Sequence, residues 1–352
     1  MGEISSTEGE KCGILPHVGR RPAFENGGIG MLIPAVLFFV GLIFLIKGGD
    51  WFVDGAVNIA HRFGVPELLI GATVVSIGTT LPEVMVSTTS ALGGHGEIAY
   101  GNAIGSVICN AALIAAITIA VRPGQVDPRT LRTPVIFFFA AAGIYGAVAY
   151  TTGYFSRMVG IVLLAVFAAY MAVTIRQIKG AASPASAGES GAAGEGSTAK
   201  DTVLLAAGAV LIALGARLLV DNGILIAQEL GVPESVIALT FIALGTSLPE
   251  LVTAVSALAK GHGSLSLGNI VGANLFNLVL VSGVSVTLAP FEVPRSAVIW
   301  GRNASLVLEL PVMFLVMLLL TIPALVRGTL SRGQGILMLA VYAAFCAVQF
   351  AL

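Results

Sequence analysis

The sequence predicts an all-α integral membrane protein with ten transmembrane helices, arranged as two inverted five-helix repeats with broken helices at the midplane. Three observations predict this fold class: the composition, a series of apolar segments, and an internal duplication. Apolar residues make up 56% of the 352 residues, and charged residues only 11%. A typical soluble domain has about 25% charged residues, so most of this chain is expected to lie in lipid.

Composition also limits the partners. The formal net charge is −1, which provides no basic surface for nucleic acid. The three cysteines, Cys12, Cys109 and Cys346, are odd in number and far apart, so no disulfide framework is expected. The lipid bilayer is the expected environment, and the sequence indicates neither a protein partner nor a resident cofactor.

Ten apolar segments follow one another along the chain, separated by short polar or Gly/Pro-containing stretches. About 20 apolar residues suffice to span a bilayer. The first segment is longer than an upright helix needs, so we expect it either to tilt or to extend past the membrane at Gly48-Gly49-Asp50. The predicted spans are 31–60, 66–92, 98–121, 133–151, 156–178, 202–228, 233–259, 265–289, 299–322 and 333–351.

The segments divide into two sets. Residues 1–30 are polar and lack the apolar core of a secretory signal, so a flexible tail is expected, with Met31 as an alternative start of the protein. Residues 31–179 form the first predicted repeat. Residues 180–200 contain mainly Gly, Ala, Ser and Glu, as flexible linkers do, and residues 201–352 form the second repeat.

The two repeats are copies of each other. Glu83 and Glu250 are 167 positions apart, and the same offset relates several further motifs without a gap. An odd number of spans in each copy makes the second copy enter the membrane from the opposite side, as in the inverted repeats of secondary transporters. The matching pairs are Asp54 with Asp221, 64–67 with 231–234, 94–96 with 261–263, 101–102 with 268–269, and Asn110 with Asn277.

Basic residues in the predicted loops indicate the orientation. Cytoplasmic loops carry an excess of Lys and Arg. One side holds Arg157, Arg295 and Arg302. The other holds Arg62, Arg122, Arg129, Arg132, Arg176, Lys179, Lys200, Lys260, Arg327 and Arg332. This asymmetry predicts a cytoplasmic linker, with both termini outside.

The motif around each glutamate predicts the functional site. Gly78-Thr79-Thr80-Leu81-Pro82-Glu83 and its copy, Gly245–Glu250, place a carboxylate inside an apolar segment. A charge near the bilayer centre costs about 2.5–3.5 kcal/mol on insertion scales, so a functional role is the default interpretation. Pro82 and Pro249 are expected to break or kink each helix just before the glutamate. Broken helices that meet across a repeat interface commonly form an ion site.

Helical spacing selects the other candidate ligands. Residues three and four positions apart share a helix face, which aligns the hydroxyls of each motif with its glutamate. In the following span, Gly residues are expected to allow close approach to the broken helix, and Cys109 is expected to point away from the site. Oxygen-only sites suit hard cations such as Ca²⁺, and they can equally hold Na⁺. The side-chain candidates are Glu83, Glu250, Thr79, Thr80, Thr246, Ser247, Ser106, Asn110 and Asn277.

These paired motifs resemble the two α-repeats of the calcium/cation antiporter superfamily, and within it the prokaryotic sodium/calcium exchangers. The motifs are Gly-Thr-Thr-Leu-Pro-Glu with Gly-Asn-Ala-Ile-Gly-Ser, and Gly-Thr-Ser-Leu-Pro-Glu with Gly-Asn-Ile-Val-Gly-Ala. The resemblance extends from Met31 to the C-terminus, excluding the linker. It implies a secondary transporter, not an enzyme, that exchanges Na⁺ for Ca²⁺ across the cell membrane by alternating access.

The same resemblance implies roles for individual residues. Glu83 and Glu250 would be central ligands for which Ca²⁺ and Na⁺ compete. Backbone carbonyls at Ser76 and Ala243 would join them. The first and sixth spans would slide past the other eight as a gate. Na⁺-site oxygens would come from Thr79, Thr80, Ser106, Thr246 and Ser247, and Asn110 and Asn277 would complete the ring.

Two departures from the family pattern bear on the ions. Ala273 stands where Ser106 offers a hydroxyl, which could weaken one Na⁺ site. Asn277 stands where several relatives carry Asp, which argues against potassium dependence. The alternative function is other cation antiport on the same fold, either H⁺/Ca²⁺ or K⁺-dependent exchange. An intramembrane enzyme would need a further polar cluster that the sequence does not show, and an inverted repeat favours alternating access over a channel.

Overall fold

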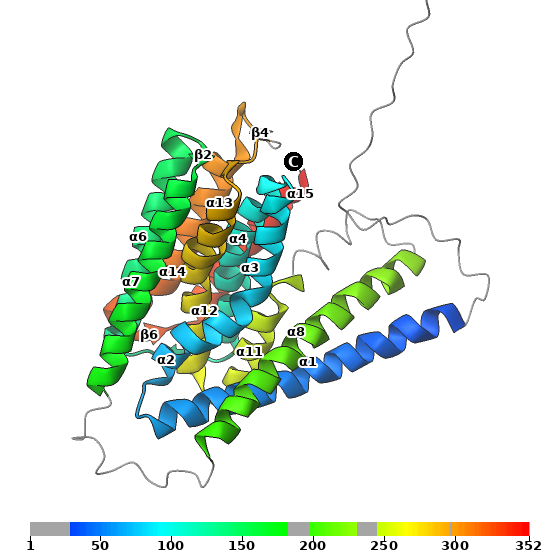
Figure 1. The fold of residues 1–352 in the computed structure, drawn as a ribbon, viewed down its shortest axis with the longest axis vertical. Helices are drawn as coiled ribbons and strands as arrows, with labels where there is room; N and C mark the ends of the chain where they lie inside the picture. The colour runs from blue at the N-terminus through cyan, green and yellow to red at the C-terminus, as the bar shows by residue number, and fades with distance from the viewer. Residues whose placement is uncertain (1–28, 182–196, 231–244, 296–297, 352) are drawn as a thin grey trace, which may run out of the picture.

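The computed structural model describes residues 29–181, 197–230, 245–295 and 298–351. The chain is a bundle of long helices (Figure 1), as predicted. Among the described residues, nine helices are long and apolar enough to cross a membrane, and Leu248–Ala259 is a shorter apolar helix. The predicted span 233–259 begins outside the described residues, so the described part of the chain contains only the end of that span.

The first half contains α1 (Ile29–Arg62), α2 (Glu67–Ile70), α3 (Ser76–Leu92), α4 (Gly96–Cys109), α5 (Ala116–Val121), α6 (Pro128–Thr151) and α7 (Arg157–Ala181). Two π-helical turns interrupt it, η1 (Gly71–Val75) and η2 (Asn110–Ala115). The second half contains α8 (Thr198–Glu229), α11 (Leu248–Ala259), α12 (Gly263–Phe276), η5 (Asn277–Val281), α13 (Ser282–Leu288), η6 (Ser305–Glu309), α14 (Leu310–Arg327) and α15 (Arg332–Ala351).

The duplication is visible as matching local structure. The π-helical turns η2 and η5 begin at Asn110 and Asn277, which are 167 positions apart. Such turns occur frequently at functional sites. The helices before them, α4 and α12, are both 14 residues long, and each follows a loop whose glycine, Gly94 or Gly261, has a positive φ (83° or 89°). The two copies therefore adopt the same local conformation.

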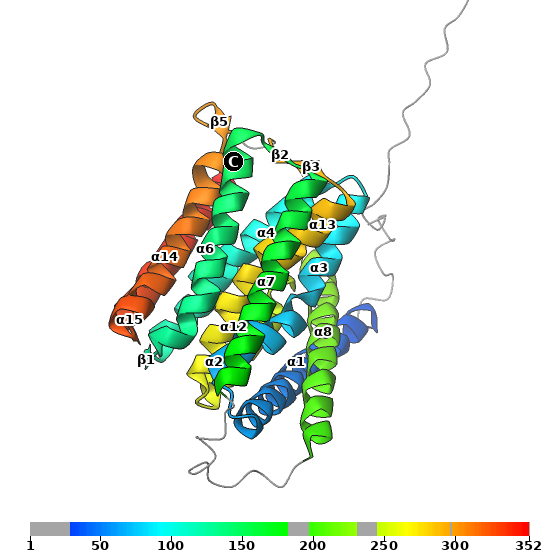
Figure 2. The same cartoon turned by 60° about the vertical axis from the view of Figure 1, so that its left-hand side comes forward.

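Short strands join the two halves reciprocally. Strand β1 (Gly124–Gln125) pairs with β6 (Thr329–Leu330), and β2 (Tyr154–Phe155) pairs with β3 (Phe291–Glu292). Strands β1 and β3 are 167 positions apart, so each follows the same helix of its own repeat and pairs with the other repeat. The two pairs lie at opposite ends of the bundle (Figures 1 and 2), which is the arrangement that an inverted repeat produces.

Helices α1 and α8 pack tightly together and run obliquely to the other helices, as the length of the first span predicted (Figure 1). Their backbones touch through glycines: a Cβ added to Gly41 would lie 2.8 Å from the carbonyl oxygen of Gly215, and one added to Gly208 would lie 2.5 Å from the backbone nitrogen of Phe52. The buried Asp201 of α8 accepts hydrogen bonds from Arg62 (2.9 Å) and Asn58 (3.2 Å) of α1.

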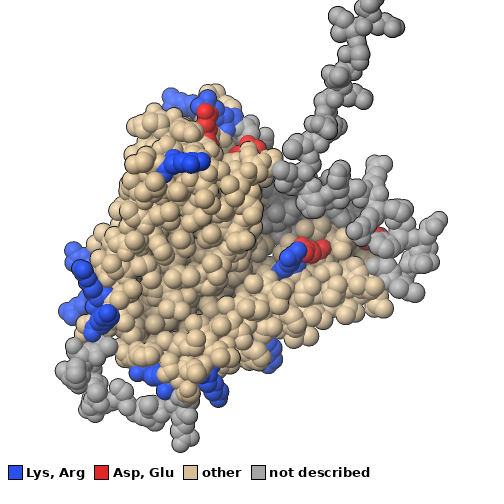
Figure 3. All heavy atoms as spheres, in the orientation of Figure 1, with Lys and Arg blue, Asp and Glu red and all other residues tan. Residues whose placement is uncertain are grey.

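The distribution of charge fits a membrane environment. On the face shown in Figure 3, the Lys and Arg side chains gather near the ends of the bundle, and the wall between them is almost uncharged. Large apolar side chains such as Leu81, Met85 and Ile136 are more than half exposed. In water such exposure would be unfavourable, whereas in lipid it is expected.

One predicted boundary is wrong. The span placed at 299–322 instead begins at Ser305 and ends at Arg327. Residues before it form a hairpin of β4 (Val298–Ile299) and β5 (Arg302–Asn303), with positive φ at Trp300 and Gly301. The hairpin carries apolar residues, including a fully exposed Trp300, so hydropathy alone extended the span into it.

The predicted helix breaks occur in only one copy. In the second copy, Thr246 and Ser247 form a turn and α11 begins at Leu248, so the interruption before Glu250 is confirmed. In the first copy, α3 continues through Pro82, so the helix is not broken there. Proline removes one helical hydrogen bond but need not end a helix that tertiary packing supports. The irregularity lies upstream instead, at η1.

Helix α12 is the buried centre of the bundle, with every residue from Leu265 to Phe276 buried. As predicted for the glycines of this span, its backbone lies directly against α2 and η1. A Cβ added to Gly268 would lie 2.2 Å from the carbonyl oxygen of Leu68, and one added to Gly272 would lie 2.6 Å from the Cα of Ala72. This contact brings the second repeat against the start of the first glutamate helix.

We therefore expect Gly268→Ala to lower the melting temperature of the detergent-purified protein, because overpacking costs about 1–3 kcal/mol. Gly143→Ala is the matched control: Gly143 lies within α6 with nothing within 4 Å of an added Cβ, and Ala is the better helix former by about 1 kcal/mol. An unchanged melting temperature for Gly268→Ala would show that α2 can move away from α12 at little cost.

Candidate cation site

The two predicted glutamates meet inside the bundle. Helices α3 and α11, which carry Glu83 and Glu250, contact each other and the π-helical turns of both repeats. Both side chains are completely buried, and the two carboxylates lie near enough to interact electrostatically. Neither carboxylate accepts a hydrogen bond from the residues that the structure describes. Burying two uncompensated negative charges is costly, so the site is suited to positive charge.

Further polar atoms around the glutamates also lack partners. The Thr80 and Ser247 hydroxyls and both side-chain amides, Asn110 and Asn277, are buried without a hydrogen bond. These residues occupy equivalent positions in the two repeats. Most buried polar groups in proteins are hydrogen-bonded, so such a concentration indicates a ligand. Carboxylate, amide and hydroxyl oxygens are the donor set of hard cations.

The two remaining predicted threonines, Thr79 and Thr246, each form a hydrogen bond with a residue of the other repeat. The Thr79 hydroxyl donates to Oδ1 of Asn269 (3.2 Å), and the Thr246 hydroxyl donates to Oδ1 of Asn102 (3.3 Å). The two bonds are equivalent under the 167-residue offset. The ligand prediction did not include Asn102 and Asn269. The sequence did contain a signal for these two residues, because an asparagine directly follows the first glycine of the second motif in both copies.

The other predicted positions vary in what the structure shows. The Ser76 hydroxyl donates to the carbonyl of Gly71 (2.7 Å), and the Ser76 carbonyl oxygen lies 3.5 Å from the Thr79 hydroxyl. Ser106 is buried on α4, one turn before Asn110. Ala273, its counterpart, is also buried and provides no side-chain oxygen. Ala243 lies outside the described residues.

Cys109 does not point away from the site, contrary to the prediction. Its thiol lies beside the hydroxyls of Ser247 and Tyr342 and close enough to Glu250 to interact electrostatically. The helical-wheel argument failed because π-helical turn η2 begins immediately after Cys109 and changes the direction of the side chains around it. A thiol is a poor ligand for hard cations, so the predicted donor set is unchanged.

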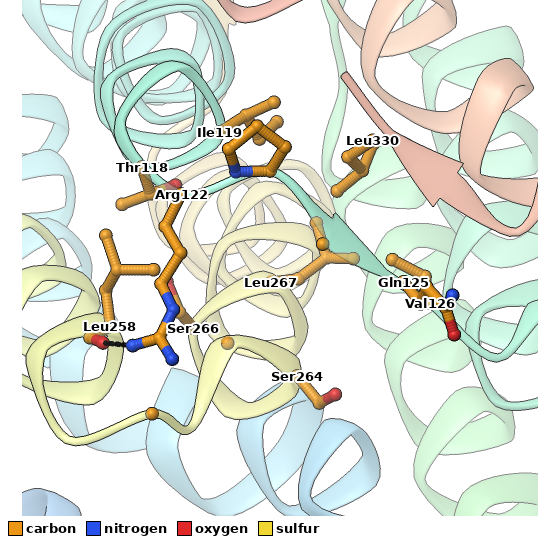
Figure 4. A pocket seen from close by; sticks show the side chains of 14 residues that line it. Thr118, Ile119, Arg122, Gln125, Val126, Leu258, Ser264, Ser266, Leu267 and Leu330 are labelled. Carbon is orange, nitrogen blue, oxygen red and sulfur yellow. Dashed lines mark hydrogen bonds between the residues drawn. The ribbon is translucent and has the colours of Figure 1, made fainter. Parts of the chain in front are cut away.

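Two cavities of the described structure differ in the charged residues that line them. The larger cavity, of about 460 Å³, is lined by Asn102, Ser106, Thr246 and the acidic residue Glu309. It lies beside Gly245, where the described segment 245–295 begins. The other, of about 210 Å³, is shown in Figure 4. No acidic residue is among its lining residues, and Arg122 projects into it and donates to the carbonyl of Leu258 (3.2 Å). Of these two cavities, the larger offers cations an approach lined by predicted site residues.

A direct test of cation binding is thermal unfolding. A ligand that binds only the folded state raises stability, by about 2.7 kcal/mol at one hundred times its dissociation constant. We expect Ca²⁺ to raise the melting temperature of the purified protein, and Glu83→Gln or Glu250→Gln to abolish this increase.

Glu292→Gln is the control, because Glu292 is an exposed acid that pairs with Arg295 on the surface (3.3 Å). Equal increases in melting temperature for all four proteins would place the bound Ca²⁺ elsewhere.

Comparison with known proteins agrees with this geometry. The chain matches the family described as sodium/calcium exchanger protein over residues 33–176 and 200–351. It is 30% identical to the sodium/calcium exchanger MaX1 of Methanosarcina acetivorans over 351 aligned positions, covering 90% of this chain and 98% of that protein. It is 34% identical to the inner membrane protein YrbG of Escherichia coli, covering 81% of this chain and 88% of that protein.

Comparison with solved structures also identifies a sodium-calcium exchanger. A solved structure of the sodium-calcium exchanger NCX_Mj, from crystals soaked with Na⁺ and Sr²⁺, superposes with a TM-score of 0.76 at 31% sequence identity. The superposition covers 90% of this chain and 98% of that one. The multi-pass helical bundle is thus shared in both sequence and fold. The chain belongs to the sodium/calcium exchanger family, whose members are membrane antiporters for cations and not enzymes.

Proposed function

We propose that this protein exchanges Na⁺ for Ca²⁺ across the cell membrane as a secondary active antiporter. The observation that carries the proposal is the pair of buried, unpartnered carboxylates, Glu83 and Glu250, within a shell of neutral oxygens. Two carboxylates neutralise one Ca²⁺ and can equally hold more than one Na⁺. Because both ions need the same carboxylates, they compete, and that competition couples their movements.

The proposed ligands come from both halves of the chain. Glu83, with Thr79, Thr80 and the carbonyl of Ser76, lies in the first glutamate motif, and Glu250, with Thr246 and Ser247, lies in the second. Further oxygens come from Ser106, Asn110 and Asn277, while the proposed carbonyl of Ala243 lies outside the described residues. Movement of helices on either side of such a site exposes it to one side of the membrane at a time, as alternating access requires.

The proposed moving part is the pair α1 and α8. Glycine contacts and the Asp201 hydrogen bonds join these two helices into one unit. The ion pairs that join this pair to the rest of the bundle lie on partly exposed surface, where ion pairs contribute little. They run from Lys260 to Asp50 (3.4 Å) and Asp54 (2.7 Å), and from His61 to Glu67 (3.4 Å). The pair can therefore slide past the other helices as a body, with the linker on the cytoplasmic side and both termini outside.

The alternative is other cation antiport through the same site, with H⁺ or K⁺ as the coupling ion. The test uses proteoliposomes loaded with Na⁺ and diluted into Na⁺-free medium containing Ca²⁺, with the pH gradient collapsed by a protonophore and K⁺ omitted. We expect rapid Ca²⁺ uptake, because the outward Na⁺ gradient drives it.

Glu83→Gln and Glu250→Gln should each abolish this uptake, because a carboxamide cannot balance the charge of Ca²⁺, while Glu292→Gln should retain it. Uptake that follows an imposed pH gradient in place of the Na⁺ gradient would establish the alternative. Retained uptake in both glutamate variants would remove the central role of these two residues.

Ala273 offers a separate test of Na⁺ coordination. We expect Ala273→Ser to lower the Na⁺ concentration for half-maximal exchange, about twofold to tenfold, because it adds a hydroxyl at the counterpart of Ser106. Ser106→Ala is the matched reverse change and should raise the same concentration. The measurement is the Na⁺ dependence of Ca²⁺ flux, and unchanged values in both variants would show that this position is not a ligand.

A further inference from the structure

The cross-repeat hydrogen bonds of Asn102 and Asn269 point to a role beyond packing. Each carboxamide accepts the hydroxyl proton of a threonine that belongs to the other repeat. A threonine hydroxyl has one proton and two acceptor lone pairs. Once the proton is held by the asparagine, only the lone pairs can face the cavity, and lone pairs are what a cation needs.

The structure determines the orientation of Asn102. Its amide nitrogen donates to the Ser87 hydroxyl (2.8 Å) and to the backbone carbonyl of Glu83 (3.3 Å). Because the carbonyl of Glu83 can only accept, the amide nitrogen must face α3, and Oδ1 must therefore face Thr246. The same side chain thus connects the backbone of one glutamate to a hydroxyl from the opposite repeat.

The hydroxyl proton has a competing acceptor nearby. The Thr79 hydroxyl lies within reach of the Glu250 carboxylate, but its geometry satisfies the hydrogen bond to Asn269 and not one to Glu250. Hydrogen bonds to a charged acceptor are stronger than those between neutral groups. Without Asn269, the Thr79 hydroxyl would donate its proton to the Glu250 carboxylate. A cation could then bind the hydroxyl and carboxylate oxygens only after that hydrogen bond was broken.

We propose that Asn102 and Asn269 are positioning residues for cation binding, which accept the hydroxyl protons of Thr246 and Thr79 and so leave the lone pairs of these hydroxyls to face a cation. At Thr79 this also directs the proton away from the Glu250 carboxylate. This role rests on the proposed function. It requires contact between the two repeats, because each asparagine and its threonine lie in different halves of the chain.

Asn102 and Asn269 differ in the hydrogen bonds that fix the orientation of their side chains. Asn269 accepts at Oδ1 from Thr79 (3.2 Å) and lies 3.4 Å from the Ser76 hydroxyl, but its amide nitrogen has no hydrogen-bond partner. The counterpart of Ser87 in the second repeat is Ala254, which offers no acceptor. The orientation of Asn102 is therefore the more strongly fixed of the two, and Asn102 is the better residue to test.

The test is a double-mutant cycle on the Na⁺ dependence of Ca²⁺ uptake in proteoliposomes. Asn102→Leu and Thr246→Val should each raise the half-maximal Na⁺ concentration about threefold to tenfold. Because Asn102 acts through the Thr246 hydroxyl, the double variant should be no worse than the more impaired single variant.

The control cycle combines Asn102→Leu with Thr79→Val, whose effects should multiply, because Thr79 donates to Asn269 and not to Asn102. Multiplied effects in the Asn102–Thr246 cycle as well would overturn the proposal, since a purely structural role of Asn102 would be independent of the Thr246 hydroxyl. Melting temperatures of all variants identify those that are folded.

If Asn102→Leu does not fold, Ser87→Ala replaces it. This change removes the closest partner of the amide nitrogen without altering a proposed ligand, and it should raise the half-maximal Na⁺ concentration by a smaller factor. An unchanged value would contradict the orientation argument. Failure of the wild type to exchange Na⁺ for Ca²⁺ would refute the proposed function itself, whereas an active wild type with independent effects would refute only the role of the asparagines.

Discussion

Electrostatic repulsion between two buried carboxylates is the constraint on which the rest of the structure depends. The carboxylates of Glu83 and Glu250 lie near each other, completely buried in the bundle, and accept no hydrogen bond from the described residues. Such an arrangement is stable only when positive charge balances it. In the proposed exchanger, this instability is the driving force for binding: the site always requires cations, and the ion gradients decide which ones occupy it.

Reciprocal contacts between the repeats hold this arrangement together. Strand pairs β1–β6 and β2–β3 join the halves at the two ends of the bundle, and backbone contacts at Gly268 and Gly272 join them in the middle. The hydrogen bonds of Thr79 and Thr246 repeat the pattern at the site. Each half thus completes the polar shell of the other, so the site exists only when both repeats are packed together.

The sequence predicted most of the fold, because each span is an independent apolar segment. Predicted spans such as 98–121 match the observed helices within a few residues. Errors arose where local chemistry was ambiguous. The hairpin before α14 is apolar enough to resemble a helix, Pro82 is accommodated within α3, and η2 changes the side-chain directions on which the exclusion of Cys109 depended. In each case tertiary packing outweighed a local preference.

The duplication with its fixed offset, the paired glutamates and the oxygen-only character of the site could all be read from the sequence, since each is a property of residue identity and spacing. Only the tertiary structure decided which polar groups meet. Asn102 and Thr246 are 144 positions apart and Thr79 and Asn269 are 190 apart. The spacing of residue types along the chain does not predict contacts between residues so far apart, because these contacts depend on how α4 and α12 pack against the opposite repeat.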